Sequence, residues 1–220
     1  MPTPLAADAL LANLAWRYAT KQFDPARKID AGTWTKIEEA MTLAPSSYGL
    51  QPWKFVVLSS NADLRARLRA VSWNQPQITD ASHMVVFAQK QNVAKEDVER
   101  HIQRVHQVRG GDASALAGYR DMMVNSMANP AGLQGGTMLA YTRAQTYIAL
   151  GFGLYTAAQL NIDACPMEGF DANKYDEILG LTPLGYHAAV VATFGYRSPN
   201  DAMAKLAKVR FEPKDVILRM

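Results

Sequence analysis

Two pairs of basic residues, near opposite ends of the chain, have the types and spacing needed to bind an anion. Arg17 and Lys21 are four residues apart, so their side chains point the same way in a helix and in an extended strand. Lys208 and Arg210 flank Val209, so they also share one side of an extended segment. Arginine offers a bidentate fork to a phosphate, and lysine adds a point charge. A lone pair of this kind is more often a solvated surface feature, so neither pair identifies a site by itself.

A loop between an amphipathic run and an apolar run is a second candidate site. Pro45 and Pro52 lack a backbone N–H and fix φ, so the loop is neither helix nor central strand. Ser46, Ser47 and Gly49 are small, and their backbone and hydroxyl groups can approach a flat or charged ligand closely. The same composition is equally typical of a simple turn.

The composition predicts one domain over residues 1–220 with a sizeable core. The chain has 220 residues, of which 49% are hydrophobic and 20% charged, and no linker-like stretch divides it. The formal charge of +3 is spread along the chain, which favours small anionic ligands over nucleic acid. No run reaches the roughly 18 apolar residues of a membrane span.

Cysteine and histidine usage exclude further classes of site. Cys165 is the only cysteine, has no base nearby in sequence, and is interpreted as a small buried core residue. A single thiol fits a reducing compartment, and polar residues interrupt the apolar N-terminus, so we expect a cytoplasmic protein without a signal peptide. His101 and His106 are five residues apart, which does not match helical metal ligands, so no metal site is predicted.

Five motifs along the chain resemble, in the same order, those of the FMN-dependent nitroreductase family, which includes dihydropteridine-reductase-like members. They are R-x-x-T-K-x-F at 17–23, A-P-S-S-x-x-x-Q-P-W-x-F at 44–55, N-x-x-x-x-x-D-A-S-H at 74–83, P-x-E-G-F at 166–170 and K-x-R at 208–210. Each motif is weak, but five in family order make a strong signal. No G-x-G-x-x-G follows a strand, so a Rossmann site is not predicted.

The resemblance implies an FMN site built from all five motifs. The implied cofactor-binding residues are Arg17, Tyr18, Ala19, Lys21, Pro45, Ser46, Ser47, Gly49, Asn74, Gln77, Pro166, Met167, Glu168, Gly169, Lys208 and Arg210. Arg17, Lys208 and Arg210 would neutralise the FMN phosphate, and Lys21 would lie at the N1/O2 edge of the flavin.

The remaining implied roles concern the flavin ring. Asn74 would hydrogen-bond the ring edge, while backbone N–H groups near Glu168 and Gly169 would meet the flavin N5 and O4. Such backbone donors hold the site of hydride acceptance without adding a titratable group. We expect no catalytic protein nucleophile or obligatory general acid. Tyr119, in an excursion at about 112–136 that would cover the flavin, is a possible substrate contact.

Three positions depart from the family pattern. Gln77 stands where many relatives carry Lys or Arg, Gly49 where several carry Asn, and Ala19 where many carry Ser. Each change should remove a polar contact to FMN. We expect FMN still to bind, with a lower flavin potential than in lysine-bearing relatives.

The resemblance also implies an activity and a partner. FMN would take a hydride from NADH or NADPH and pass two electrons, in a ping-pong cycle, to nitroaromatics, quinones or related acceptors. Family members are homodimers with FMN at the interface, and residues 211–220 would extend over the partner subunit. The alternatives are a non-catalytic FMN-binding or sensing protein, or a same-fold enzyme for reductive dehalogenation or flavin fragmentation.

The elements that must position these residues follow from periodicity, and the resemblance supplies their arrangement. It implies an α+β, nitroreductase-like fold, in which helices flank a mixed, mostly antiparallel central sheet and two chains intertwine. The patterns predict helices at 5–16, 30–43, 61–71, 95–109, 112–128, 138–160 and 171–179, and strands at 54–59, 84–88 and 186–195. The run at 138–160 is apolar nearly all round, so we expect a central buried helix that can pack across a dimer interface.

Overall fold

An antiparallel sheet of four strands forms the centre of the computed structural model, which describes residues 3–133 and 135–220. The strands are β1 (Trp53–Leu58), β2 (His83–Lys90), β3 (Asp163–Met167) and β4 (Tyr186–Gly195), and their order is β1-β2-β4-β3. One isolated parallel bridge, between Ala19 and Ala164, extends the edge beyond β3. The α+β, mostly antiparallel architecture is therefore confirmed.

The two central strands, β2 and β4, are buried along nearly their whole length. All five residues from Met84 to Ala88 have no exposed surface, in agreement with the apolar run in the sequence. β3 escaped prediction because Pro166 interrupts its pattern. Its place at the edge of the sheet explains how a proline is tolerated there, since an edge strand leaves one row of backbone groups unpaired.

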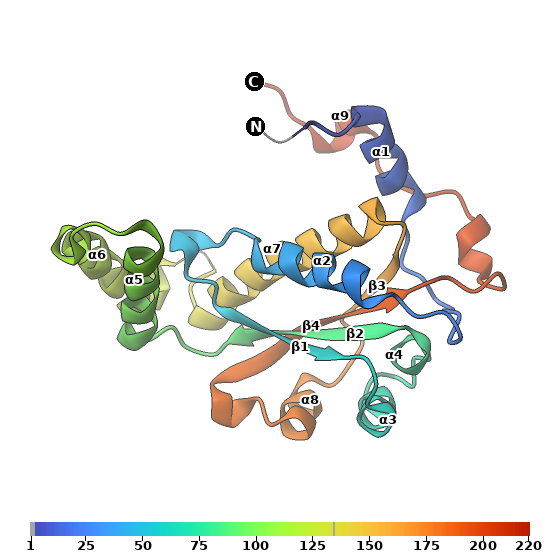
Figure 1. Ribbon diagram of the computed structural model, residues 1–220, viewed down its shortest axis with the longest axis horizontal. Coiled ribbons are helices and arrows are strands. Elements are labelled where there is room, and N and C mark those ends of the chain that lie inside the picture. Colours follow the sequence, from blue (N-terminus) through green and yellow to red (C-terminus); the bar gives the residue numbers. More distant parts are fainter. Residues whose placement is uncertain (1–2, 134) are drawn as a thin grey trace.

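Helices α2 (Ala31–Thr42) and α7 (Met138–Gln159) run side by side over one face of the sheet (Figure 1). Asp30 caps α2 by accepting a hydrogen bond from the Thr33 backbone N–H at 2.9 Å. Gly153 lets the two helices approach closely, because a Cβ there would lie 3.2 Å from the Met41 side chain. The predicted central helix is confirmed.

The opposite face carries α3 (Ala62–Ala70), α4 (Gln77–Asp80) and α8 (Ala172–Leu179), as Figure 1 shows. Leu68, Ile78 and Tyr175 from these helices are fully buried against the sheet. α4 is a single short turn of helix where the sequence predicted a polar loop. This helix has only four residues, too few to show a helical period in the sequence.

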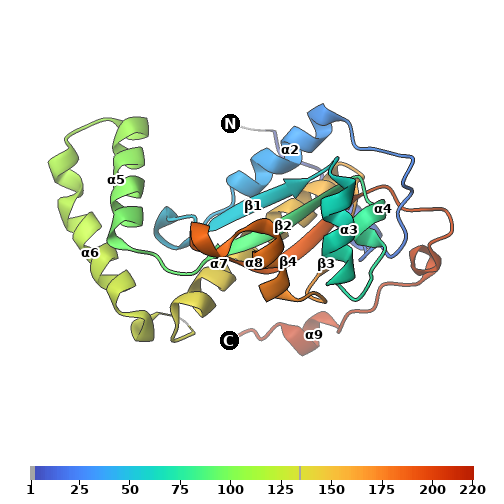
Figure 2. The same cartoon turned by 90° about the horizontal axis from the view of Figure 1, so that it is seen from below.

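A helical pair, α5 (Lys95–Arg109) and α6 (Ala117–Ala128), stands away from the sheet (Figure 2). Val98, Met123 and Met127 are buried in this pair. The helix predicted at 112–128 is divided into a 3₁₀ turn at Ala113–Leu116 and α6. Further 3₁₀ turns cover Ser47–Gly49, Pro130–Gly132, Thr182–Leu184 and Ala202–Lys205.

The two ends of the chain contribute little to this core. α1 (Ala7–Trp16) has no buried residue, and the short α9 (Pro213–Val216) lies in an exposed tail. Helices α1 and α9 both lie on the side of the sheet that carries α2 and α7 (Figure 1). Over the described residues, no helix combines the length and the apolar character needed to cross a bilayer.

Candidate functional site

The two basic pairs predicted from the sequence meet at one cleft of about 600 Å³. The ammonium group of Lys208 donates a hydrogen bond to the backbone carbonyl oxygen of Arg17. Burial and the neighbouring Arg210 lower the pKa of Arg17, and burial, Arg17 and Arg210 lower the pKa of Lys208. Within residues 3–133 and 135–220, these three cations form no ion pair with a carboxylate. Such a cluster of unneutralised charge favours an anionic ligand.

Asp201 fixes the backbone that carries Tyr18 and Lys21 into this cleft. Its buried carboxylate accepts hydrogen bonds from the Tyr18 hydroxyl at 2.9 Å and from the backbone N–H groups of Lys21 and Gln22 at 2.8 and 3.1 Å. Burial, and then the hydrogen bond to Asp201, raise the pKa of Tyr18 to about 12. The side chain of Lys21 makes no ion pair in the described part of the chain, so it remains available to a ligand.

The cleft lies beside strand β3 because the segment after α1 joins the edge of the sheet. Ala19 bridges Ala164, and the Thr20 backbone N–H donates to the Ala164 carbonyl oxygen at 3.3 Å. Cys165, next along β3, is fully buried, as predicted. Burial raises the pKa of its thiol, whereas Lys21 and Arg17 oppose the rise, so both cations lie close to this strand.

Gln77 brings an unsatisfied amide to the same region. Its side chain is 4% exposed, and its Oε1 has no hydrogen-bond partner among the described residues. The amide also lies near the Cys165 thiol. Burial raises the pKa of that thiol, and the Gln77 amide opposes the rise. A buried polar atom without a partner calls for an explanation, and a bound polar ligand supplies one.

Asn74 and Gly169 lie on two loops that are joined to each other. Arg69 donates to the Asn74 Oδ1 at 3.0 Å, and the Gln75 amide donates to the Gly169 carbonyl oxygen at 2.9 Å. A Cβ at Gly169 would lie 2.5 Å from the ring of Trp73, so a larger residue there would displace this ring. Trp73 is 81% exposed and has a φ of +51°, and nothing in the sequence predicted its place over Gly169.

Glu168 is held by two side chains of α7 that the sequence interpretation missed. The Tyr147 hydroxyl donates to the Glu168 Oε1, and Arg143 reaches the same oxygen at 3.3 Å. Burial, followed by the hydrogen bond to Glu168, raises the pKa of Tyr147. Arg143 and Tyr147 are four residues apart, a spacing that puts both on one face of α7. Inside a long apolar run, that spacing gave no separate signal.

The loop at 45–49 lies on the other side of α7. The Ser47 backbone N–H donates to the Gln145 Oε1 at 2.8 Å, and the Ser46 hydroxyl accepts from the Gln51 N–H at 2.8 Å. Each helical residue turns the chain by about 100°, so Gln145 faces away from its neighbours at 143 and 147. The loop meets α7 near the start of the helix, whereas Asn13, which precedes the cationic cleft, donates to Gln159 at its end at 3.1 Å, so one chain does not bring Pro45, Ser46 and Ser47 to the cluster around Arg17.

Gly49 and Tyr119 also lie apart from the cationic cleft. Gly49 has a φ of +75°, and a Cβ there would lie 3.2 Å from the His101 ring on α5. Tyr119, on α6, is 38% exposed and donates to the Tyr48 carbonyl oxygen at 3.3 Å. Both residues therefore belong to the surroundings of the 45–49 loop.

A model of the nitroreductase family matches residues 14–196. The chain belongs to the nitroreductase family. A Staphylococcus haemolyticus protein assigned as an NAD(P)H nitroreductase is 37% identical over 211 residues, which cover 92% of this chain and 93% of that protein. The major NAD(P)H-flavin oxidoreductase of Aliivibrio fischeri is 32% identical over 219 residues, which cover 94% of this chain and 97% of that protein.

Solved structures share the nitroreductase fold of this chain. A Bacillus subtilis protein assigned as a nitroreductase has a TM-score of 0.85 at 17% identity and covers 98% of this chain and 100% of its own. An Exiguobacterium sibiricum protein assigned as a nitroreductase, solved in complex with FMN, has a TM-score of 0.77 at 18% identity and covers 100% of this chain and 99% of its own. At such identities the likeness concerns the fold alone, and it agrees with the family match.

Within this nitroreductase chain, the predicted residues fall into two groups. One group gathers at β3 and its neighbours and includes Arg17, Tyr18, Ala19, Lys21, Asn74, Gln77, Pro166, Met167, Glu168, Gly169, Lys208 and Arg210. The other group consists of Pro45, Ser46, Ser47 and Gly49, on the far side of α7. The two groups are therefore separated from each other within a single chain.

Proposed function

We propose that this chain is an FMN-dependent NAD(P)H oxidoreductase that reduces nitroaromatics, quinones or related acceptors by two electrons in a ping-pong cycle. One observation carries the proposal: Arg17, Lys208 and Arg210 converge on a cleft of about 600 Å³ without a neutralising carboxylate among the described residues. Relatives named for NAD(P)H and flavin, at 32 and 37% identity over nearly the whole chain, support it.

The charge of the cluster fits the FMN phosphate. A phosphate monoester carries close to two negative charges at neutral pH, and it would favour the charged forms of Arg17 and Lys208, whose pKa values are lowered first by burial and then by neighbouring cations. The two arginines offer forks to its oxygens, and the ammonium of Lys208 is already oriented by the Arg17 carbonyl oxygen.

The rest of the cleft fits a polar ring. When bound, FMN accepts a hydride from the nicotinamide and passes two electrons to the acceptor. Lys21 would stabilise negative charge at the ring edge, and the unpaired amide of Gln77 would gain a polar partner. Gly169 presents only backbone to this side, and the Arg143–Tyr147 pair holds the preceding Glu168 in place.

We further propose a homodimer with FMN at the interface between subunits. The loop at 45–49 contacts α7 near its start, through Gln145, whereas α1, which leads into the cationic cleft, contacts its end through the Asn13–Gln159 hydrogen bond, so a second chain is needed for both to reach one ligand. Ile148, Phe152 and Tyr155, spaced as one helical face, are 37 to 39% exposed on this helix. Apolar side chains left open on a central helix support its burial against a second copy.

The C-terminal tail would cover the partner subunit. Phe211 and Leu218 are 81% and 80% exposed, in a tail that packs little against its own chain. Deleting 211–220 should therefore raise the dimer dissociation constant, measured by sedimentation velocity across a dilution series. A tail-deleted protein that stays dimeric down to the same concentration as the full chain would contradict this role.

The activity is tested by colour and by anaerobic reduction. The purified protein, after incubation with FMN and removal of free cofactor, should be yellow, and NADH or NADPH should bleach it without oxygen. Addition of a nitroaromatic or a quinone should then restore the colour. A colourless protein that ignores FMN would refute the proposal, and a yellow protein that neither nicotinamide reduces would favour a non-catalytic flavin binder or another flavin chemistry.

A single domain over residues 1–220 and a cytoplasmic location complete the proposal. One buried thiol, Cys165, suits a reducing compartment. Activity of the cytoplasmic fraction, compared with the membrane and secreted fractions, checks the location.

A further inference from the structure

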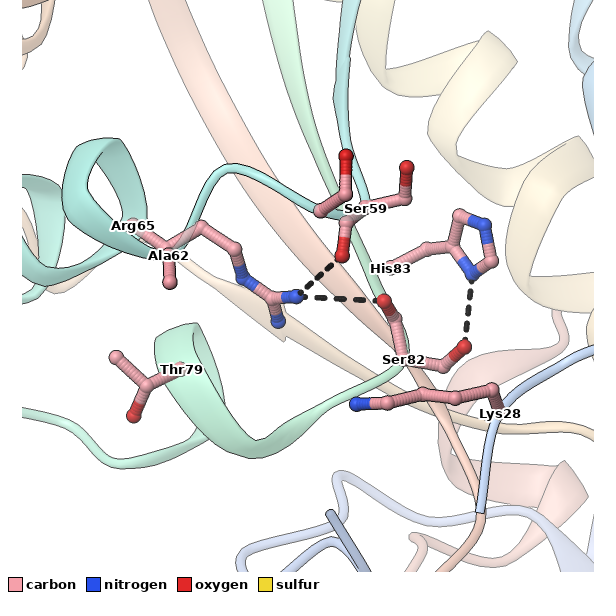
Figure 3. A pocket seen from close by; sticks show the side chains of 8 residues that line it. Lys28, Ser59, Ala62, Arg65, Thr79, Ser82 and His83 are labelled. Carbon is pink, nitrogen blue, oxygen red and sulfur yellow. Dashed lines mark hydrogen bonds between the residues drawn. The ribbon is translucent and has the colours of Figure 1, made fainter. Parts of the chain in front are cut away.

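A second basic pocket lies at the end of the sheet where β1 leaves it and β2 begins. Its volume is about 500 Å³, and no residue lines both this pocket and the cationic cleft at Arg17. Figure 3 shows its side chains converging from α3, from the stretch around α4 and from the loop before α2. Its lining consists of Lys28, Ser59, Ser60, Ala62, Arg65, Thr79, Ser82 and His83.

Arg65 places a full positive charge in the wall of this pocket. It is only 4% exposed, and its guanidinium donates to backbone carbonyl oxygens alone, including those of Ile78 at 2.7 Å and Ala81 at 2.6 Å. Asp80 favours the charged form, but burial is the larger effect and lowers the pKa of Arg65. Carbonyl dipoles orient the guanidinium without cancelling its charge, so the charge remains available to an anion.

Lys28 adds a second cation. Its side chain extends along the edge of the pocket toward Thr79 and the Arg65 side (Figure 3). Among the residues that the structure describes, Lys28 takes part in no ion pair. The pocket therefore contains two basic side chains and no carboxylate in its lining.

The hydroxyl groups divide into those already in use and those that are free. Ser82 accepts from the Ile29 N–H at 2.9 Å and lies 2.9 Å from the His83 Nδ1, while Thr79 bonds Asp80. Ser59 and Ser60, by contrast, form no side-chain hydrogen bond within the described part of the chain and are exposed in the lining. They are free donors beside the two cations.

His83 lines the same pocket, close to both cations. Burial, then Arg65 and then Lys28, lower the pKa of His83 to about 4. The Ser82 hydroxyl, which accepts from the Ile29 N–H, lies within hydrogen-bond distance of Nδ1, and which of the two donates depends on the tautomer of the ring. The ring is held by stacking on Trp34 with centroids 4.0 Å apart.

We propose that this pocket is a second anion site, which binds the phosphate group of a small phosphorylated ligand through Lys28, Arg65 and the hydroxyls of Ser59 and Ser60. Two cations match the double charge of a phosphate monoester better than the single charge of a carboxylate. The proposal is independent of flavin binding, because none of its residues belongs to the cleft at Arg17.

Inorganic phosphate is the probe, and the His83 imidazole is the reporter. The His83 signals are followed by NMR during titration of the FMN-saturated protein with phosphate at constant ionic strength. Saturable shifts are expected, with a rise in the pKa of His83 as the bound anion offsets the charges of Arg65 and Lys28. Because the reporter lies in this pocket, the result does not depend on phosphate bound at the flavin site, or on whether the protein takes up FMN.

Lys28→Gln should weaken phosphate binding about fivefold or more. Lys36→Gln, which removes the same charge from the exposed face of α2, should leave it unchanged. FMN affinity should be the same in both variants. Ser60→Ala should also weaken phosphate binding, and it leaves the buried Arg65 undisturbed.

Three results would overturn the site: His83 signals that do not saturate with phosphate, equal phosphate affinity in Lys28→Gln and the wild type, or acetate binding as tightly as phosphate. The last result would refute the assignment of a phosphate group in particular.

Discussion

The ammonium group of Lys208 donates a hydrogen bond to the backbone carbonyl oxygen of Arg17, although 191 positions separate the two residues. The contact fastens the extended C-terminal segment to the end of α1. It also sets two cations side by side: burial and then Arg210 lower the pKa of Arg17, and burial and then Arg17 and Arg210 lower the pKa of Lys208. The arrangement is therefore less stable by itself than with an anion bound between the cations.

Removing a cation from this cluster should weaken FMN binding. Arg17→Gln and Lys208→Gln should each lose about 1.5–3 kcal/mol of binding free energy, the range for hydrogen bonds to charged groups. That corresponds to roughly a 10- to 150-fold rise in Kd, measured by quenching of flavin fluorescence. Lys36→Gln, on the exposed face of α2, is the matched control. An Arg17 variant that binds FMN within twofold of the wild type would show that the phosphate lies elsewhere.

Gln77→Lys should raise the reduction potential of bound FMN. Gln77 is buried and has an unpaired amide oxygen near Cys165 and the cations that surround it. A positive charge there would stabilise the negative charge of the reduced flavin, and about 1.4 kcal/mol corresponds to roughly 30 mV for two electrons. Potentiometric titration measures the shift, with Gln77→Met as the uncharged control. No positive shift in the lysine variant would refute the placement of Gln77 at the flavin.

Gly169→Ala should destabilise the protein by forcing the Trp73 ring away. The added Cβ would lie 2.5 Å from that ring, and overpacking of this kind costs about 1–3 kcal/mol. Thermal unfolding should show a lower Tm, and Trp73→Ala should remove most of the penalty in the double variant. Gly118→Ala, where nothing lies within 4 Å, should keep the Tm or raise it. Equal penalties with and without Trp73 would show that the ring is not the obstacle.

The sequence predicted the long elements and the basic pairs because their signals are local. The helix at 138–160 is apolar on more than one face and the strand at 84–88 is apolar throughout, and the structure confirms both. Arg17 and Lys208 were paired through a resemblance, since nothing in the local sequence of either residue indicates the other.

The missed features depend on contacts between distant segments. β3 is a strand because β4 pairs with it, despite a proline in its middle. Trp73 covers Gly169 only after two loops meet, and Arg143 and Tyr147 reach Glu168 from inside an apolar helix. The separation of Ser47 from Arg17 likewise depends on which end of α7 each segment packs against.

Breaking the buried pair between Asp163 and Arg197 should destabilise the protein strongly. Asp163 is 4% exposed and accepts from the Arg197 Nε at 2.7 Å and from its backbone N–H at 2.8 Å. Asp163→Ala leaves the guanidinium without its carboxylate partner, so the free energy of unfolding should fall by about 3–5 kcal/mol. Asp121→Ala breaks the exposed pair with Arg120 and should cost less than about 1 kcal/mol. Urea denaturation compares the two, and similar losses would contradict the special role of the buried pair.

His83 should make the protein less stable in mild acid. Its pKa falls from an ordinary value of 6.5 to about 4 in the folded chain, so between these values the unfolded state binds the extra proton. Above pH 6.5 His83 is neutral in both the folded and the unfolded state, and stability is at its full value. As the pH falls toward 4, the imidazole is protonated in the unfolded state only, and the free energy of unfolding decreases. The full shift corresponds to about 3 kcal/mol, and partial exposure of the ring reduces the expected effect to on the order of 1–2 kcal/mol.

The measurement is the free energy of unfolding from pH 7 to 4.5, in buffers without phosphate. The wild type should lose stability more steeply than His83→Gln over this range, whatever the difference between them at pH 7. His106→Gln, which removes a histidine of α5 far from the pocket, controls for the general loss of an imidazole. Parallel curves for the wild type and the His83 variant would mean that burial, Arg65 and Lys28 together do not lower the pKa of this ring, and would also remove the reporter on which the second anion site depends.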